Sequence, residues 1–175
     1  MKARIWMCVV MAVIIALAAA AANAGENPKP RPFTGTFLGE VYWENQGVDI
    51  CPPQGGFVTM SAATGQMSHL GQATMTEVHC AGFDGLPLNG TAILVAANGD
   101  KMWAAAVPST CAWAEAPPPM FAEECNYTVA GGTGRFETAS GSLHMEVYVT
   151  PTGDPVADPS IRFPAKFVWA GMISY

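Results

Sequence analysis

Two pairs of histidine and glutamate, each two residues apart, are the parts of this sequence best suited to chemistry. Glu77 precedes His79, and His144 precedes Glu146. Residues i and i+2 of an extended strand point to the same side, so each pair sets an imidazole beside a carboxylate. Such a pair can transfer protons or supply two donors to a metal ion. The polar face of any strand also supplies pairs of this kind, so a structural role stays open for both.

A further histidine, His69, lies on the same side of its strand as Glu77 and His79 if no bulge intervenes. His69 and His79 are ten positions apart in the sequence, which is roughly 30 Å at ~3.3 Å per strand residue. That distance is too long for both imidazoles to bind one ion. We therefore predict no metal site and no other cofactor.

Four more residues are candidates for ligand binding. His144 and Glu146 are expected to look outward, but if their face lined the interior they would form a polar anchor for a ligand. Arg135 is expected at the rim of the fold, paired with Glu137, and binding of a carboxylate is the alternative. Trp103 offers a large apolar surface to an interior cavity, or else it fills a solid core.

The motifs of common hydrolases are missing from the sequence. It has no G-x-S-x-G elbow and no H-E-x-x-H, and its cysteines are expected to be oxidised rather than nucleophilic. The glycine-rich segment 131–136, GGTGRF, lacks the lysine and the long helix of a phosphate-binding loop. The sequence therefore identifies no reaction, and we expect a protein without enzymatic activity.

The first 24 residues have the pattern of a cleavable signal peptide. Lys2 and Arg4 precede an uncharged run over 5–22, and the small-residue triplet Ala-Asn-Ala ends at position 24. An uncleaved membrane anchor is the alternative, because the run is just below spanning length. We predict export to the periplasm or out of the cell.

Cleavage leaves one domain's worth of chain, which we divide into an extended proline-rich leader over 25–33 and a domain over 34–175. Removing Lys2 and Arg4 leaves 6 basic residues against 14 acidic ones, a net charge near −8. A surface of that sign repels phosphate backbones, so nucleic acid is not an expected partner. No second long apolar run follows, and no membrane span is expected after cleavage.

Four cysteines remain after cleavage, and an even number in an oxidising compartment favours two disulfides. A zinc site is the alternative, but no C-x-x-C pair is present. A turn centred between positions 65 and 66 would set Cys51 opposite Cys80, and Pro118 is equidistant from Cys111 and Cys125. We predict the disulfides Cys51–Cys80 and Cys111–Cys125. The segment between the second pair carries three prolines and exposed aromatics, which suit a contact surface, a lid or a cover over the end of the fold.

Alternation of apolar and polar residues dominates the chain after the leader. It is cleanest over 142–149, and an Asn-Gly dipeptide at 98–99 suits the tight turn of a hairpin. No window after the leader shows a sustained helical period. Eight strands can close into an antiparallel barrel or pack as a sandwich, and we favour the barrel because closure removes exposed edges. The strands are expected over 34–44, 56–63, 67–80, 89–97, 101–107, 122–130, 141–150 and 163–174.

Four stretches of the chain resemble a known family when they are taken together. They are FTGT at 33–36, SHLGQATMT at 68–76, AANGDKMW at 96–103 and GGTGRFETASGSLH at 131–144. Their order resembles the allene oxide cyclase and dirigent-like barrel proteins, nearest to secreted bacterial members. The resemblance implies an eight-stranded antiparallel barrel, sometimes oligomeric, with a central apolar cavity in which the family's enzymes handle reactive hydrophobic intermediates. The catalytic acidic residues of those enzymes do not align with positions of this chain, so none is carried over.

The expected function is that of a secreted, non-enzymatic β-barrel that binds a small hydrophobic ligand or a protein partner. The alternative is a cyclase-like or isomerase-like enzyme acting on a hydrophobic intermediate in the cavity. An enzyme of that kind needs an ionisable group facing the interior, whereas a binding protein can have a wholly apolar one. A structural role as a self-associating homo-oligomer is a third alternative.

Overall fold

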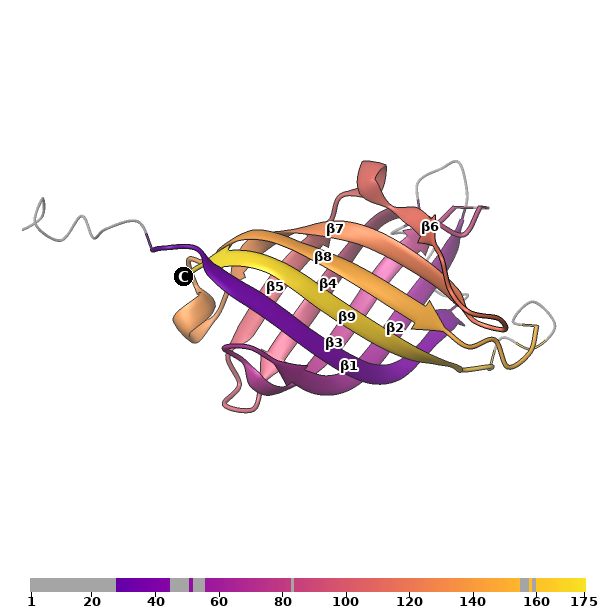
Figure 1. Ribbon diagram of the computed structural model, residues 1–175, viewed down its shortest axis with the longest axis horizontal. Coiled ribbons are helices and arrows are strands. Elements are labelled where there is room, and N and C mark those ends of the chain that lie inside the picture. The colour runs from indigo at the N-terminus through magenta and orange to yellow at the C-terminus, as the bar shows by residue number, and fades with distance from the viewer. Residues whose placement is uncertain (1–27, 45–50, 52–55, 83, 155–157, 159) are drawn as a thin grey trace, which may run out of the picture.

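The chain folds into a closed antiparallel β-barrel, seen from the side in Figure 1. The structure is a computed structural model that describes residues 28–44, 51, 56–82, 84–154, 158 and 160–175. The predicted signal peptide, 1–24, lies outside the described residues. The strands are β1 (Arg31–Glu44), β2 (Phe57–Met67), β3 (Gly71–Ala81), β4 (Pro87–Ala96), β5 (Lys101–Ala106), β6 (Ala112–Ala114), β7 (Phe121–Gly132), β8 (Ser140–Val149) and β9 (Phe163–Ser174).

Closure comes from strand β5, which pairs with both β4 and β7. The sheet order is β5-β4-β3-β2-β1-β9-β8-β7-β6, and the additional β5–β7 pairing joins its ends into a barrel of eight strands. All pairs are antiparallel. The prediction of an all-β, eight-stranded antiparallel barrel is therefore confirmed, and the alternative of a sandwich is wrong.

The ninth strand, β6, was not predicted. Strand β5 covers only the second half of β7, with Ala106 opposite Tyr127. The first half of β7 would therefore expose unpaired backbone groups on that side. Strand β6 covers them, with Ala112 opposite Glu124.

Strand β1 begins at Arg31, so the last three residues of the predicted leader belong to the sheet. Pro32 lies opposite Met172 of β9, and pairing of β1 with β2 begins only at Gly35. At Pro32 the strand is thus paired on one side alone, where a missing N–H is tolerated. The next residue, Phe33, is fully buried in the barrel core.

The turn between β2 and β3 lies at His69 and not at position 65, where we predicted it. Met67 pairs with Gly71, and His69 has a positive φ of 65°. Gly65 instead continues β2 beside β1, where a Cβ atom would collide with the carbonyl oxygen of Thr36. The glycine is therefore needed for close strand approach rather than for a turn.

Both predicted disulfides are present. Cys111 and Cys125 flank a hairpin symmetric about position 118, as the spacing predicted. Cys51 is bonded to Cys80, but the spacing argument for this pair was wrong. Cys80 lies opposite Val58, because the turn is at His69, and Cys51 reaches it from outside β2.

The barrel interior is solid at one end. The short helix η3 (Gly134–Phe136) places Phe136 over this end, which also holds the C-terminus (left in Figure 1). Phe136 is fully buried and its ring centroid lies 4.9 Å from that of Tyr175. The core behind it is filled by large side chains, chief among them Phe33, Phe37, Leu94, Met102 and Trp169.

Candidate functional site

The opposite end of the barrel contains a cavity of about 330 Å³. It lies where β1, β3 and β8 end and where β2, β7 and β9 begin. That volume falls at the lower end of the range for small-molecule pockets, about 300–1,000 Å³. Its walls are largely apolar side chains that alternate inward, among them Val41, Met145, Val147, Val149, Phe163 and Phe167.

Four of the aromatic side chains that line the cavity form two contacting pairs. Trp43 stacks on Phe57 with ring centroids 5.0 Å apart, and Trp113 meets Phe121 edge to face at 5.8 Å. Trp113 and Phe121 are 49% and 40% exposed. Both belong to the segment closed by the Cys111–Cys125 disulfide. This segment therefore forms part of the cavity wall and also exposes apolar side chains to solvent.

A buried polar cluster adjoins this apolar cavity, centred on Glu77. Its Oε1 atom lies 2.8 Å from Nδ1 of His79 and accepts a hydrogen bond of 2.9 Å from the hydroxyl of Tyr127. Its Oε2 atom accepts a 3.0 Å hydrogen bond from Ser61. All four side chains are buried. Glu77 and His79 thus share one face of their strand, as predicted, and this face points into the barrel.

The cluster draws on three strands. Glu77 and His79 share the inward face of β3, and Ser61 lies directly opposite Glu77 on β2. Tyr127 comes from β7, which is not a neighbour of β3 in the sheet, so its hydroxyl meets Glu77 across the interior. Barrel closure therefore assembles the cluster, while His69 takes no part because it lies in the turn.

A glycine makes room for the side chain of His79 at its Cβ atom. Gly90 of β4 lies opposite His79, and a Cβ atom at position 90 would be 2.9 Å from the Cβ of His79 and 3.6 Å from Glu77 Oε1. Two Cβ atoms closer than 3.0 Å are too close, so one of the two residues would have to shift. The absence of a side chain at position 90 therefore keeps His79 against the carboxylate.

Glu77 and His79 form an ion pair despite their burial. Burial alone would raise the pKa of Glu77, but the charge of His79 and the hydrogen bonds from His79, Tyr127 and Ser61 outweigh it and lower the pKa. Burial would lower the pKa of His79, but the charge and hydrogen bond of Glu77, with the charge of Glu123, raise it above 6.5. A carboxylate only accepts hydrogen bonds, so Nδ1 of His79 carries a proton.

The other ring nitrogen of His79 is available to the cavity. Nε2 has no hydrogen-bond partner in the described part of the chain, and His79 is among the residues that line the cavity. In the imidazolium form Nε2 is a donor. The cavity therefore presents one charged donor to whatever enters it.

Glu123 is a third ionisable group that lines the cavity, after Glu77 and His79, and it was not among the residues predicted from the sequence. It is 7% exposed, and burial together with the charge of Glu77 raises its pKa to about 7, although His79 opposes the shift. Burial and the charge of Glu77 also raise the pKa of Tyr127 well above 10, so this phenol stays protonated. The site thus contains a fixed ion pair and one carboxyl group that changes charge near neutral pH.

A signal for Glu123 was available in the alternation of β7. Cys125, Tyr127 and Val129 are buried on the inward face, and Glu123 is two residues before Cys125. A charged residue on an apolar face marks a candidate site. The run Glu123-Glu124 conceals this, since adjacent glutamates read as one solvated patch although they point to opposite faces of the sheet.

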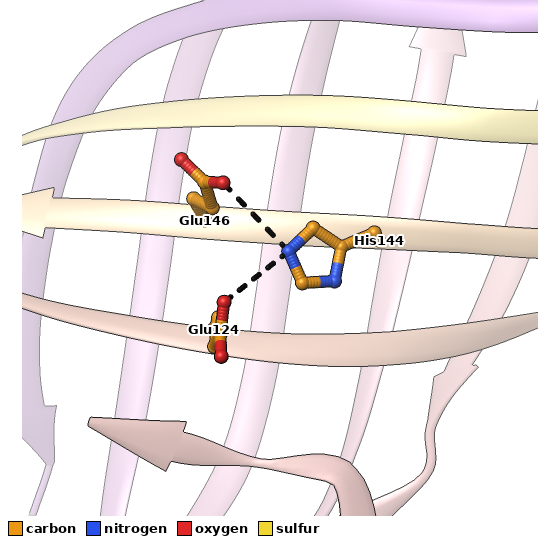
Figure 2. A group of neighbouring side chains, drawn as sticks. All are labelled: Glu124, His144 and Glu146. Carbon is orange, nitrogen blue, oxygen red and sulfur yellow. Dashed lines mark ion pairs between the residues drawn. The ribbon is translucent and has the colours of Figure 1, made fainter. Parts of the chain in front are cut away.

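His144 and Glu146 face solvent on the outside of β8. Their side chains are 40% and 37% exposed, and they gather with Glu124 of β7 as Figure 2 shows. The expectation that they look outward is confirmed. The alternative, a polar anchor inside the barrel, is wrong because Leu143, Met145 and Val147 occupy the inner face of the strand.

Trp103 and Arg135 do not line the cavity either. Trp103 lies between Met102 and Ala104, which are both fully buried, so its indole is on the outer face and half-buried. Arg135 is a rim residue, as expected, but at the solid end of the barrel. It pairs with Asp100 at 3.5 Å rather than with Glu137, because η3 turns it toward the hairpin of β4 and β5.

Comparison with known proteins assigns the chain to no family. No family model, curated protein or solved structure matches it. Among the described residues no helix is long and apolar enough to cross a membrane.

Proposed function

We propose that this protein binds one small, mainly apolar molecule at the open end of the barrel. One observation carries the proposal: an apolar cavity of about 330 Å³, lined by tryptophan and phenylalanine rings, has a buried ion pair and a buried carboxyl group in its wall. Apolar walls with a few convergent polar groups are the general form of a small-molecule site. The walls supply affinity and the polar groups supply orientation.

The polar groups favour a ligand with an acceptor oxygen, such as a carbonyl or hydroxyl group. Nε2 of His79 donates, and Glu123 donates while it is protonated, near and below pH 7. A ligand carboxylate is disfavoured as Glu123 ionises, since the charges repel. The two disulfides are compatible with a secreted or periplasmic site of action, where they would persist.

Blocking the cavity tests this proposal. Val147 lines the cavity, and Val147→Trp fills it, whereas Val95→Trp adds the same volume on the outer face of β4. We expect the wild type to bind the neutral fluorophore N-phenyl-1-naphthylamine at one site per chain. Val147→Trp should bind it at least tenfold more weakly, and Val95→Trp within about twofold of wild type. Equal binding by all three proteins would overturn the proposal.

Native mass spectrometry of protein purified without detergent would identify the class of the bound ligand. We expect a co-purified molecule in the wild type and in Val95→Trp that is lost from Val147→Trp. Its mass and fragments would name the ligand class. A co-purified molecule that Val147→Trp also retains would be bound outside the cavity. That result would count against the proposed site.

A second function, proton-transfer catalysis on the bound molecule, is favoured by Glu123. A general base is most effective when its pKa is near the working pH, and the pKa of Glu123 is about 7. Ionised Glu123 would take a proton from the ligand while His79 stabilises the negative charge that develops on oxygen. This agrees with the cyclase-like or isomerase-like alternative, and the likeness to allene oxide cyclase and dirigent-like barrels stays a prediction.

Deuterium exchange at carbon atoms next to a carbonyl separates the two functions. For an enzyme, NMR in D₂O would show exchange in small apolar ketones with wild type, and Glu123→Gln would abolish exchange while keeping fluorophore binding within about threefold. For a binding protein, wild type would give no exchange above buffer. The matched control is Glu124→Gln, which makes the same change at the neighbouring outward position and should behave as wild type in both assays.

A further inference from the structure

Three side chains that can ligate a metal meet on the outer face of the barrel, away from the cavity. Glu124 of β7 lies directly opposite Glu146 of β8, and His144 lies two residues before Glu146 on the same face. Nε2 of His144 is 3.5 Å from Glu124 Oε2 and 3.8 Å from Glu146 Oε1, as the dashed lines in Figure 2 mark. One donor atom from each residue lies within 4.8 Å of the other two.

A neighbouring amide sets the orientation of the imidazole. Asn126 lies opposite His144 in the β7–β8 pairing, and its Oδ1 atom is 3.0 Å from Nδ1 of His144. An amide oxygen only accepts, so Nδ1 carries the proton in this contact. In the neutral ring Nε2 then has a free lone pair, and it faces the two carboxylates. Histidine ligands of metals usually have their second nitrogen held in this way.

A hydrogen bond also fixes the orientation of the Glu146 carboxylate. The hydroxyl of Tyr148 donates a 2.7 Å hydrogen bond to Glu146 Oε2. The other oxygen, Oε1, is the one nearest to His144. The bond to Tyr148 therefore turns Oε1 toward the imidazole nitrogen and limits the rotation that would otherwise weaken a metal site.

Among the described residues, the ion pairs of the Glu124 and Glu146 carboxylates are with the imidazole of His144. Glu124 and Glu146 are opposed across two strands, an arrangement that repels when both are ionised. Within the described residues neither has a lysine or arginine partner, and His144 is their shared neighbour. A single imidazolium would neutralise one carboxylate, whereas a divalent cation would neutralise both.

We propose that Glu124, His144 and Glu146 bind a divalent transition metal ion, with Zn²⁺ as the reference. One imidazole nitrogen and two carboxylate oxygens suit zinc and similar ions better than Ca²⁺, which takes six to eight oxygens. With ligand bonds of about 2.0–2.2 Å, tetrahedral donors lie about 3.3 Å apart. The distances from His144, 3.5 and 3.8 Å, are close to this value, and the two carboxylates, whose donor atoms lie within 4.8 Å of each other, would close in around the ion.

The site would leave at least one coordination position open to solvent. The three side chains are between 37% and 41% exposed, so water can complete the coordination. The prediction of no metal site rested on the distance between His69 and His79, and it treated His144 and Glu146 only as a pair. The third ligand, Glu124, belongs to the preceding strand and is brought in only by the register of β7 and β8. No residue of this site belongs to the cavity cluster.

Calorimetric titration of chelator-stripped full-length protein with Zn²⁺ tests the proposal. We expect one ion per chain for wild type and at least tenfold weaker binding for His144→Ala and for Glu124→Gln. Glu137→Gln, which removes an exposed carboxylate elsewhere on the surface, is the matched control and should bind as wild type. Circular dichroism checks that each variant is folded. If one of the two ligand variants fails to fold, the other still tests the site.

Cobalt gives a readout that an ion pair between histidine and glutamate does not produce. Co²⁺ bound with wild-type protein should show visible ligand-field absorption, and addition of Zn²⁺ should remove it. Ca²⁺ in tenfold excess should not compete. Absence of one-to-one binding in wild type would overturn the proposal, as would binding that survives unchanged in both His144→Ala and Glu124→Gln.

Discussion

The two pairs of histidine and glutamate have the same spacing and opposite environments. Glu77 and His79 face the interior of β3, where they are 2% and 7% exposed. His144 and Glu146 face solvent on β8 and are close to 40% exposed. The spacing predicts that each pair shares a face, but it does not say which face becomes the inside.

Burial changes what the same side chains can do. Inside, the low dielectric strengthens the ion pair of Glu77 and His79, and it keeps Glu123 protonated up to about pH 7. Outside, water screens the charges, and donors of His144 and the glutamates remain open to an ion from solvent. Position relative to the barrel wall, and not the motif, therefore decides whether such a pair is suited to proton transfer or to binding an ion.

Breaking the inner pair should have the largest effect. Glu77→Ala leaves the imidazole of His79 buried without its partner, and loss of one member of a buried pair costs about 3–5 kcal/mol. Urea unfolding at pH 7 measures this. Glu146→Ala makes the same change in the outer pair and should cost no more than about 0.5 kcal/mol. Equal costs for the two variants would remove the distinction between the pairs.

Stability should fall as pH rises from 5 to 8. Glu123 has its pKa raised from 4.5 to about 7, so the folded state holds a proton that the unfolded state has lost in this range. Ionising it in the fold costs on the order of 3 kcal/mol by pH 8, at about 1.4 kcal/mol per pKa unit.

The raised pKa of His79 acts in the same direction, because its stabilisation is complete below pH 6.5 and is lost as pH passes its folded value. Because Glu123→Gln removes the titrating carboxyl group, its free energy of unfolding, measured with urea at several pH values, should change much less with pH than that of wild type. Glu124→Gln, which changes the adjacent outward side chain, should keep the wild-type slope. A flat wild-type profile would contradict the assignment of Glu123.

A smaller effect is expected when the space beside the inner pair is filled. Gly90→Ala brings a methyl group 2.9 Å from the Cβ of His79, and overpacking of this kind costs about 1–3 kcal/mol. Thermal unfolding measures the loss. In the His79→Gly background the same change should cost less, because the Cβ atom of residue 79 that it would meet is absent. An undiminished cost there would mean that Gly90 acts through the backbone instead.

The smallest expected effect belongs to the outer face. Tyr148→Phe removes the hydrogen bond to Glu146 from a half-buried position on the outer face and should change the free energy of unfolding by less than about 0.5 kcal/mol. Zn²⁺ affinity should fall two- to fivefold, because Glu146 is no longer oriented. Urea unfolding measures the first quantity and calorimetric titration the second. A tenfold loss of affinity would make Tyr148 a direct participant and require a different ligand set.

The strand pattern of this chain could be read from the sequence because alternation is local. Leu143, Met145 and Val147 face inward and His144 and Glu146 outward, as predicted. The turn at His69 was misplaced because Gly65 suggested a turn, whereas its lack of a side chain serves contact with β1. Strand β6 was missed because three residues show no period; only the open edge of β7 explains it.

The sequence by itself determined the antiparallel strands, the Cys111–Cys125 disulfide and the shared face of Glu77 and His79, because each follows from spacing along the chain. Tertiary structure decided the rest of the inner cluster: Tyr127 reaches Glu77 from 50 positions away only because β5 pairs with β7 and closes the barrel. Closure also buried Glu123 and left Glu124 outside. Burial sets the protonation of a carboxyl group, and burial is a property of the closed wall rather than of any one strand.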